Sequence, residues 1–245
     1  MVPRGQKNAA TAIVPVDALI LCGGLGTRLR PAVPDRPKAL ATISGRPFLD
    51  ILVEELVRGG FSRLILCSGY GSDQLVDHFR GRADAEFVFS TESSPLGTGG
   101  AVRNALSSAR SDPLVVLNGD SFCRVSYSAL LAFHSELSAL ATVVVAPAAE
   151  RTDVGVVQFA PDGLILSFDE KPLAMRAQTQ FVNAGIYVLQ RRLIESEARR
   201  LPFSLEREVL PDAVAKRGCY GFPVKGPLVD IGTPDRYRAA QGLFG

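Results

Sequence analysis

The chain has 245 residues, a net charge of +2 and an apolar share of 47%. This length supports a sizeable hydrophobic core, and the composition is that of an ordinary globular protein. The sequence has no run of basic residues, so its charge argues against a protein that binds nucleic acid or a membrane surface.

The first 150 residues alternate between apolar runs and amphipathic stretches, a pattern typical of βαβ units around a mostly parallel sheet. Pro47 suits the first turn of a helix, and Gly59 and Gly60 end that helix. The predicted strands are 16–22, 62–68, 86–90 and 113–118, and the predicted helices are 47–58, 72–79, 99–109 and 126–137.

The rest of the chain is richer in predicted strands. These are 142–147, 154–159, 164–169, 183–189, 219–224 and 228–231, with helices at 204–216 and 234–243. Pro161-Asp162-Gly163 is a turn signal between two of them. We expect this part to extend the first sheet, to close it with the last two strands and to cap a cleft. The predicted fold class is therefore α/β, a mostly parallel central sheet flanked by helices with a β-rich C-terminal part over the active-site cleft.

Residues 1–15 contain no long apolar stretch, and we expect a flexible N-terminal tail rather than a signal peptide, followed by a single domain over residues 16–245. No segment reaches membrane-spanning length. The four cysteines and two histidines are scattered and contain no CxxC pair, so a structural zinc site is not expected. Scattered free thiols are typical of the reducing cytoplasm, where we expect the protein to be.

A loop rich in glycine and basic residues, CGGLGTRLRPAVPDRPK, follows the first predicted strand. The GxGxxG pattern is absent because Leu29 stands where its third glycine would be, and the sequence contains no GxxxxGK[ST] run. Glycines let the backbone approach a ligand and aim N–H groups at it, while Arg28 can form bidentate contacts with phosphate and Lys38 adds a point charge. The loop therefore indicates a polyphosphate site, although the glycines alone are as compatible with a tight turn.

Two other arginines of this loop, Arg30 and Arg36, are interpreted as solvated surface side chains. Elsewhere in the chain, Asp120 in NGD follows an apolar strand and Asp230 in LVDIGTP stands in an apolar setting. Each alone is compatible with a turn, a helix cap or a structural hydrogen bond. Because Mg²⁺ is commonly held by one or two carboxylates together with substrate phosphates, the pair is also compatible with a magnesium site.

The stretch GGLGTRLRP followed by PK resembles the signature of the sugar-1-phosphate nucleotidylyltransferases. The matching positions are Gly23, Gly24, Gly26, Thr27, Arg28, Leu29, Pro31, Pro37 and Lys38. The resemblance extends from about Asp17 to the C-terminus, and Cys22 stands where the family usually has alanine. It implies a Rossmann-like, glycosyltransferase-A-like fold. It also implies a Mg²⁺-dependent enzyme that joins a nucleoside triphosphate to a sugar 1-phosphate and releases pyrophosphate.

The resemblance also implies roles for individual residues. Arg28, Lys38 and Asp120 would be catalytic, and Asp120 and Asp230 would hold Mg²⁺. The implied nucleotide-binding residues are Leu21, Gly23, Gly24, Gly26, Thr27, Glu92, Gly97, Thr98 and Gly119. The segments EKP and NAG resemble family segments at the sugar phosphate and imply Glu170, Lys171, Asn183 and Gly185. Spacing alone would favour an exposed ion pair for EKP and is compatible with a capped turn for NAG.

The identity of the base and sugar depends on weaker signals. Glu92 is placed where it could accept the N1–H and N2–H of guanine, and a surface role is equally compatible with the sequence. The segments GRPFLD, PLGTGGA and FSLEREVLP resemble most the D-glycero-α-D-manno-heptose 1-phosphate guanylyltransferases. We therefore expect GTP and this heptose phosphate as substrates. Mannose-1-phosphate guanylyl transfer, and uridylyl or thymidylyl transfer to a hexose or N-acetylmuramic acid 1-phosphate, are the alternatives.

Two rival functions come from other classes. A non-catalytic sugar-nucleotide sensor would be favoured by loss of the catalytic positions, all of which are present. A nicotinamide-dependent oxidoreductase is disfavoured by the missing third glycine. The sequence is compatible with a monomer or a homodimer.

Overall fold

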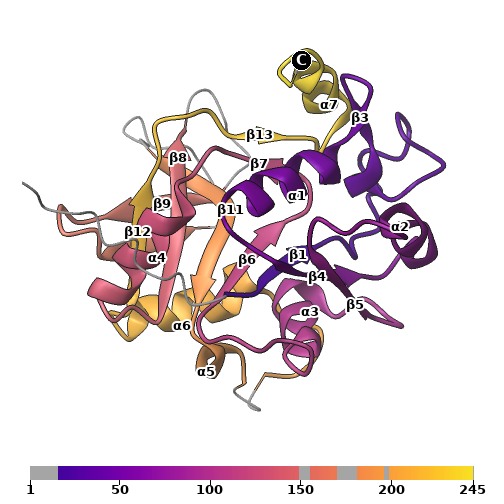
Figure 1. Ribbon diagram of the computed structural model, residues 1–245. Coiled ribbons are helices and arrows are strands. Elements are labelled where there is room, and N and C mark those ends of the chain that lie inside the picture. Colours follow the sequence, from indigo (N-terminus) through magenta and orange to yellow (C-terminus); the bar gives the residue numbers. More distant parts are fainter. Residues whose placement is uncertain (1–15, 149–154, 170–180, 196–198, 245) are drawn as a thin grey trace, which may run out of the picture.

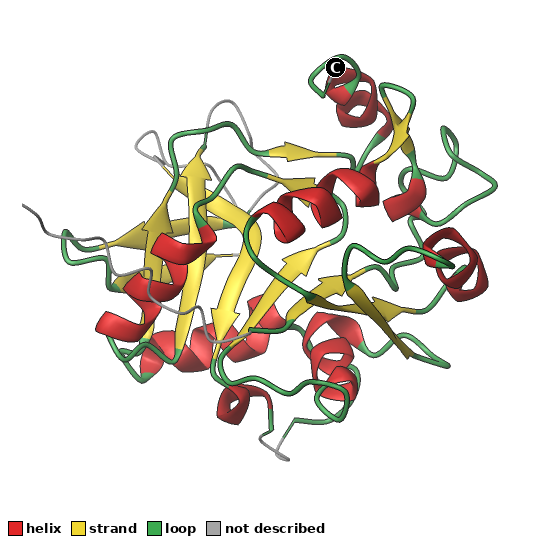
Figure 2. Ribbon diagram, viewed as in Figure 1, coloured by secondary structure: helices red, strands yellow, loops and turns green. Residues whose placement is uncertain are grey.

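The computed structural model describes residues 16–148, 155–169, 181–195 and 199–244. A nine-stranded sheet runs through the molecule with helices on both of its faces (Figure 1, Figure 2). Within the described ranges no helix is long and apolar enough to cross a membrane. The expected tail at residues 1–15 lies outside the described residues.

The first half of the chain forms the parallel part of the sheet, in the order β6-β1-β4-β5. These strands are β1 (Ala18–Leu21), β4 (Arg63–Ser68), β5 (Glu86–Thr91) and β6 (Leu114–Asn118). The apolar side chains of β1 and β6 are buried because helices cover both faces of these strands. The parallel α/β arrangement predicted from the alternating pattern is therefore confirmed.

Helices on the two faces bury two separate apolar clusters. One cluster includes side chains of α1 (Phe48–Arg58), α2 (Ser72–Phe79), α4 (Tyr127–Glu136) and α7 (Pro234–Ala240). The other includes side chains of α3 (Gly97–Ala105), α5 (Arg191–Ile194) and α6 (Leu210–Ala215). The predicted helix 72–79 has the observed bounds, whereas the helix predicted at 99–109 spans Gly97–Ala105.

The second half extends the sheet, as predicted, and most of the added pairings are antiparallel. The strand β11 (Phe181–Leu189) pairs with β6 and with β8 (Ala141–Pro147), and β12 (Cys219–Pro223) lies parallel to β8. The hairpin of β9 (Val156–Phe159) and β10 (Ile165–Asp169) joins β11 at the sheet edge. The register of β11 against β8 shifts between Asn183 and Tyr187, and Gly185 within this bulge has φ of 73°.

The prediction that residues 228–231 close the central sheet is wrong. The strand β13 (Val229–Asp230) pairs instead with β7 (Ser121–Phe122), in a separate two-stranded ribbon. Pro223 is the last residue of β12, and Val224 N–H still donates to Val145 on β8 at 2.9 Å before Gly226 and Pro227. Because Pro227 has no N–H to donate, this segment is poorly suited to extend the pairing.

Two predicted helices differ from the structure in their form. The segment 204–216 begins with a π-helical turn, Leu205–Val209, because Pro211 has no N–H to donate to the preceding turn. The last helix ends at Ala240, shortly before Gly242 with its φ of 85°. The short elements that were not predicted are the ribbon of β2 (Thr42–Ile43) and β3 (Arg46–Pro47), the 3-10 turn Lys38–Leu40, the strand β7 and the helix α5.

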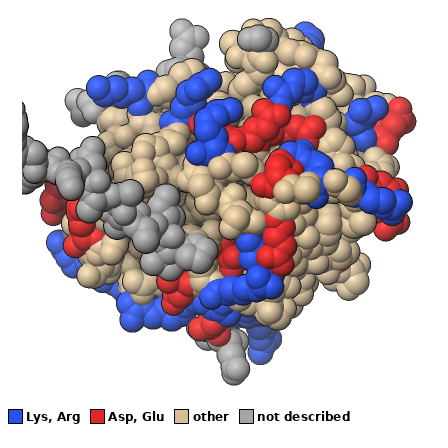
Figure 3. All heavy atoms as spheres, in the orientation of Figure 1, with Lys and Arg blue, Asp and Glu red and all other residues tan. Residues whose placement is uncertain are grey.

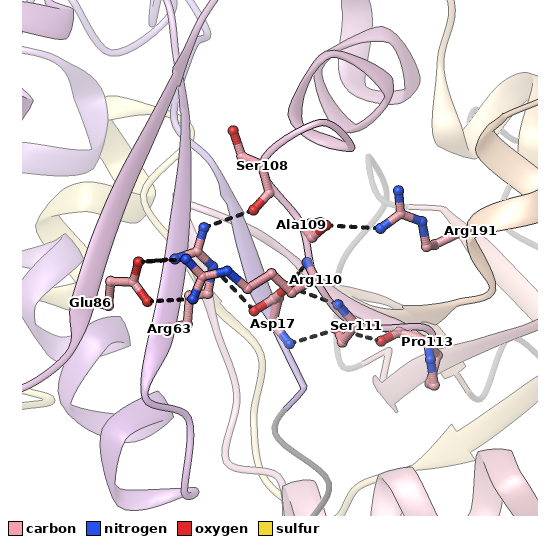
Figure 4. Close-up of polar contacts among 9 residues, drawn as sticks. All are labelled: Asp17, Arg63, Glu86, Ser108, Ala109, Arg110, Ser111, Pro113 and Arg191. Atoms are coloured by element: carbon pink, nitrogen blue, oxygen red, sulfur yellow. Dashed lines mark hydrogen bonds and ion pairs between the residues drawn. The ribbon is translucent and has the colours of Figure 1, made fainter.

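A network of ion pairs joins the amino ends of the parallel strands (Figure 4). Arg63 at the start of β4 pairs with Glu86 at the start of β5 and lies 3.5 Å from Asp17 before β1. Asp17 also accepts a hydrogen bond of 3.0 Å from the backbone N–H of Ser111, which precedes β6. This edge of the sheet is therefore tied by charge, and basic and acidic side chains are interspersed over the described surface shown in Figure 3.

Candidate active site

A cavity of about 520 Å³ lies at the carboxyl ends of β1, β4 and β6, the sheet edge opposite the ion-pair network. Ligands of open parallel sheets bind at this edge. All of the residues predicted to be catalytic or nucleotide-binding line it, although they come from five separate stretches of sequence: Leu21, Gly23, Gly24, Gly26, Thr27, Arg28, Lys38, Glu92, Gly97, Thr98, Gly119 and Asp120. The structure therefore brings this set together, and the role of each residue remains a prediction.

The glycine-rich loop is anchored at one apolar residue and one tight turn. Leu29 is buried, and its N–H donates to the carbonyl of Gly26 at 2.9 Å. Gly26 has φ of 60°, and a Cβ at this position would lie 3.2 Å from the Cβ of Lys38. The turn thus fits glycine, and it leaves Thr27 and Arg28 exposed at the wall of the cavity.

The two other arginines of this loop are exposed, as predicted. The guanidinium of Arg30 lies 4.9 Å from the ring centroid of Tyr70, and Arg36 donates to the hydroxyl of Thr42 at 3.5 Å. Neither arginine lines the cavity at the carboxyl ends of β1, β4 and β6. The cations at the cavity wall in this loop are therefore Arg28 and Lys38.

Asp120 lies directly after β6 and forms an ion pair with Lys38. The preceding residue, Gly119, donates its N–H to the carbonyl of Leu21, and a Cβ there would lie only 2.8 Å from that oxygen. The close approach of β1 and the turn after β6 therefore requires glycine, and it places the Asp120 carboxylate beside the glycine-rich loop.

The ribbon β7–β13 brings the second aspartate to the same region. Asp230 pairs in register with Ser121, and the N–H of Ile231 donates to the carbonyl of Asp120 at 3.0 Å. The Asp230 carboxylate is buried and accepts hydrogen bonds from Gly232 N–H at 3.0 Å and Arg236 at 3.2 Å. Gly232 lines the cavity, whereas Asp230 lies directly behind it.

Glu92 lies in the loop between β5 and α3, and it also lines the cavity. Its Oε2 accepts a hydrogen bond of 3.1 Å from Leu96 N–H. Its Oε1 lies where it would be 2.8 Å from a Cβ on Gly23 and 2.9 Å from one on Gly69, so two glycines make room for the carboxylate. Burial raises the pKa of the Glu92 carboxyl above its ordinary value, and the hydrogen bond from Leu96 opposes this shift by less.

The start of α3 forms the wall next to Glu92 and packs against Phe203. The N–H groups of Gly99 and Gly100 donate to the carbonyl of Phe203, and a Cβ on Gly99 would lie 2.4 Å from the Phe203 ring. Gly97, with φ of 76°, would likewise collide with the Phe203 backbone if it carried a Cβ. Phe203 therefore occupies two N–H groups of the first turn of α3, while Gly97 and Thr98 of the same turn line the cavity.

The predicted sugar side lies on β11, next to the cavity. A Cβ on Gly185 would lie 2.7 Å from the side-chain nitrogen of Asn118, which lines the cavity. Asn183 accepts a hydrogen bond of 2.9 Å from Gly185 N–H, and it donates to the Tyr187 hydroxyl at 2.8 Å. The other predicted members of this group, Glu170 and Lys171, lie outside the described residues.

Sequence reasoning missed two residues near this site. Arg236 on α7 holds Asp230, and buried Glu206 contacts Thr98. A glutamate within the apolar segment FSLEREVLP is the signal that could have identified Glu206, because a buried carboxylate needs hydrogen-bond donors nearby.

The model of the nucleotidyl transferase family matches residues 17–243. The chain belongs to this family. The match spans the glycine-rich loop, both aspartates and the ribbon that carries the second one, so the nucleotidyl transferase fold and the enzyme class expected from the sequence are confirmed.

Two relatives of this nucleotidyl transferase are named as guanylyltransferases of a sugar 1-phosphate. It is 32% identical to the D-glycero-alpha-D-manno-heptose 1-phosphate guanylyltransferase of Aneurinibacillus thermoaerophilus, over 92% of the chain and 97% of that protein. It is 35% identical to the mannose-1-phosphate guanylyltransferase catalytic subunit beta of Drosophila pseudoobscura pseudoobscura, over 93% of the chain but only 62% of that protein.

Solved structures share the fold. HddC from Yersinia pseudotuberculosis, crystallised with GMP-PN, is 32% identical with a TM-score of 0.80, over 94% of this chain and 100% of that one. A putative glucose-1-phosphate thymidylyltransferase from Bacillus anthracis superimposes with a TM-score of 0.84 at 17% identity, over 93% of this chain and 94% of that one. The second likeness concerns the fold alone.

Proposed function

We propose that this nucleotidyl transferase moves a guanylyl group from GTP to D-glycero-α-D-manno-heptose 1-phosphate and releases pyrophosphate. The observation that carries the proposal is the cavity, whose wall holds a glycine-rich loop with Arg28 and Lys38 and, packed against Gly23 of that loop, the carboxylate of Glu92. Guanine presents N1–H and N2–H donors side by side, and a carboxylate can accept both. The named guanylyltransferases among the relatives support the same base.

The preference for the heptose phosphate rests on a comparison of lengths. The chain spans 97% of the heptose 1-phosphate enzyme but 62% of the mannose-1-phosphate enzyme, at similar identity. Mannose 1-phosphate is the second candidate, favoured by the 35% identity over 232 residues. A uridylyl or thymidylyl transfer has only a likeness of fold in its support.

The proposed division of labour follows from the walls of the cavity. Arg28 and the N–H groups of Gly23, Gly24, Gly26 and Thr27 would bind the triphosphate, with Leu21 and Gly119 beneath it. Gly97, Thr98 and Glu92 would hold the base. On the sugar side, Asn183 and Gly185 would contact the sugar phosphate. Glu170 and Lys171, which lie outside the described residues, are proposed to bind the sugar hydroxyls and the attacking phosphate.

The donor set of the site fits a magnesium ion. Asp120 directly precedes β7 and Asp230 lies on β13, the two strands of one ribbon, and each already holds a protein cation, Lys38 or Arg236. Among the described residues there is no cluster of three or more potential protein ligands, which suits Mg²⁺ because it takes one or two carboxylates and completes its shell with phosphate oxygens and water. Bound there, the ion would neutralise charge on the reacting phosphates.

The reaction needs positioning more than proton transfer. An anionic oxygen of the sugar 1-phosphate forms a new bond to the α-phosphorus of GTP, while the bond from that phosphorus to the β-bridging oxygen breaks. The electron pair of the broken bond leaves with pyrophosphate. Because the nucleophile is already ionised, no general base is required, and Lys38 and Arg28 would stabilise the charge on the transferred and departing phosphates.

Pyrophosphate release with Mg²⁺ tests the proposal. GTP, UTP, dTTP, ATP and CTP would each be paired with heptose, mannose, glucose and N-acetylglucosamine 1-phosphates. We expect the highest kcat/KM with GTP and the heptose phosphate. A higher kcat/KM with mannose 1-phosphate would overturn the proposed sugar substrate. A higher kcat/KM with UTP or dTTP would overturn the proposed base. No release with any pair, together with Mg²⁺-dependent nucleotide binding, would favour a sugar-nucleotide sensor.

All four cysteines are buried free thiols, in keeping with a proposed cytoplasmic location.

A further inference from the structure

Glu206 is buried, with 7% of its surface exposed, and it contacts both Thr98 at the cavity wall and Tyr187 on β11. Its Oε2 accepts hydrogen bonds from the hydroxyls of Thr98 at 2.6 Å and Ser204 at 2.8 Å. Its Oε1 accepts one from the hydroxyl of Tyr187 at 3.1 Å. An ionised carboxylate can only accept hydrogen bonds, so each of these hydroxyls has to direct its single hydrogen toward Glu206.

This arrangement fixes what Thr98 can offer to a ligand. A threonine hydroxyl has one hydrogen and two lone pairs. The hydrogen is directed to Glu206, at a contact much shorter than the 3.4 Å approach of Thr98 to Ser204. One lone pair accepts from Leu205 N–H at 2.9 Å. At the cavity wall, the hydroxyl of Thr98 therefore presents an acceptor and no donor.

The opposite polarity arises at Asn183. Because Tyr187 directs its hydrogen to Glu206, its oxygen accepts from the amide nitrogen of Asn183 at 2.8 Å. The amide oxygen of Asn183 accepts from Gly185 N–H at 2.9 Å, which fixes the orientation of the amide. The second hydrogen of this amide nitrogen is then available, so Asn183 presents a donor on the sugar side.

We infer that Glu206 is a positioning residue that sets the hydrogen-bond polarity on both sides of the reaction centre. Through Thr98 it presents an acceptor to an N–H group of the nucleobase, and through Tyr187 and Asn183 it presents a donor to an oxygen of the sugar phosphate. The inference rests on the proposed function, because it needs a base with an N–H donor and a second substrate rich in oxygen acceptors. Thr98 and Glu206 are 108 residues apart in the sequence, and the contact belongs to the fold rather than to a local motif.

We call this arrangement the Glu206 relay; one branch runs through Thr98 and the other through Tyr187 and Asn183. Three substitutions separate the two branches. Tyr187→Phe removes the hydroxyl that orients Asn183 and leaves the contact between Glu206 and Thr98. We expect the KM for the sugar 1-phosphate to rise about tenfold, the usual cost of one hydrogen bond, with the KM for GTP within about twofold. Thr98→Val should give the converse, and Glu206→Gln, which introduces a donor among donors, should raise both.

Tyr220→Phe on β12 is the matched control, because Tyr220 loses the same atom away from the cavity, and it should leave both KM values unchanged. Titration calorimetry with GTP gives a readout independent of turnover, in which Tyr187→Phe should bind like the wild type and Thr98→Val more weakly. Should Glu206→Gln fail to fold, the two single-branch variants still decide the matter.

The outcomes separate the relay from the proposed function. A wild-type chain that releases pyrophosphate with no pair of substrates refutes the proposed function and the relay together. An active wild type whose Tyr187→Phe variant raises both KM values, or neither, refutes the relay alone. The double variant Tyr187→Phe, Glu206→Gln gives a further test. If the relay is correct, its KM for the sugar 1-phosphate should be no higher than that of Glu206→Gln alone.

Discussion

The substitution Glu92→Gln tests the base contact more sharply than any other single change. The carboxylate of Glu92 has one lone pair engaged by Leu96 N–H, which leaves acceptor positions on both oxygens for the two guanine donors. A hydrogen bond to a charged group contributes about 1.5 kcal/mol or more, about tenfold in kcat/KM. Loss of the charge and one of the two acceptors should lower kcat/KM for GTP by about 100-fold.

Inosine triphosphate supplies the matched chemical control, because it lacks only the 2-amino group of GTP. In the wild type, kcat/KM should be about tenfold lower for inosine triphosphate than for GTP, the cost of one hydrogen bond. In Glu92→Gln the two nucleotides should become nearly equivalent, since the acceptor of the 2-amino group is gone. Steady-state pyrophosphate release measures all four values, and the same GTP preference in both proteins would refute the contact.

The raised pKa of Glu92 adds two directional tests. Protonation removes an acceptor, so the KM for GTP should rise on the acid side at a higher pH than for an exposed glutamate, and Glu92→Gln should lose this limb. A carboxyl whose pKa is raised by folding stabilises the folded state below its unfolded pKa and loses that contribution as the pH rises through the folded pKa. At neutral pH, Glu92→Gln should therefore raise Tm slightly while it weakens GTP use, and a lowered Tm would contradict the burial argument.

The other predictions concern the metal, the helix start and the core. Asp230→Asn should raise the Mg²⁺ concentration for half-maximal activity about tenfold or more, and an unchanged requirement would remove this residue from the ligand set. Gly99→Ala places a Cβ 2.4 Å from the Phe203 ring and should cost about 1–3 kcal/mol in denaturant unfolding, whereas Gly226→Ala, with no neighbour within 4 Å, should cost almost nothing. Burial lowers the pKa of His134 from 6.5 to about 4, so the free energy of unfolding should fall by about 3 kcal/mol as the pH drops between these values, and His134→Gln should flatten this slope.

The residues that the family resemblance implies for the nucleotide lie together in the structure, for a physical reason. Residues such as Leu21 and Gly119 stand at the ends of continuous apolar runs, and parallel strands of one sheet present their carboxyl ends at one edge. The glycines of the loop carry a further local signal, because Gly26 needs a positive φ that few other residues adopt. Local patterning therefore explains why these residues lie around one cavity, whereas their selection came from the family resemblance and their roles stay predictions.

The sequence could not predict how the remote contacts are made. The pairing of β13 with β7 joins two-residue strands that are too short to show a periodicity. The prediction that residues 228–231 close the central sheet was therefore wrong. The bulge around Gly185 depends on the register of β11 against β8, which no single strand encodes. The contact between Glu206 and Thr98 likewise depends on tertiary packing, because the sequence around either residue does not indicate that the other lies beside it.

The position of β11 explains how one sheet can serve two substrates. This strand pairs with β6 on one side and with β8 on the other, so it joins the parallel half of the sheet to the antiparallel half. Gly185 packs on Asn118 at the end of β6, at the wall of the cavity, and Tyr187 on the same strand reaches Glu206 behind that wall. A substitution in either half can therefore change the other half's contacts through shared hydrogen bonds, which is why separate KM values for the two substrates, rather than kcat alone, reveal how the site is organised.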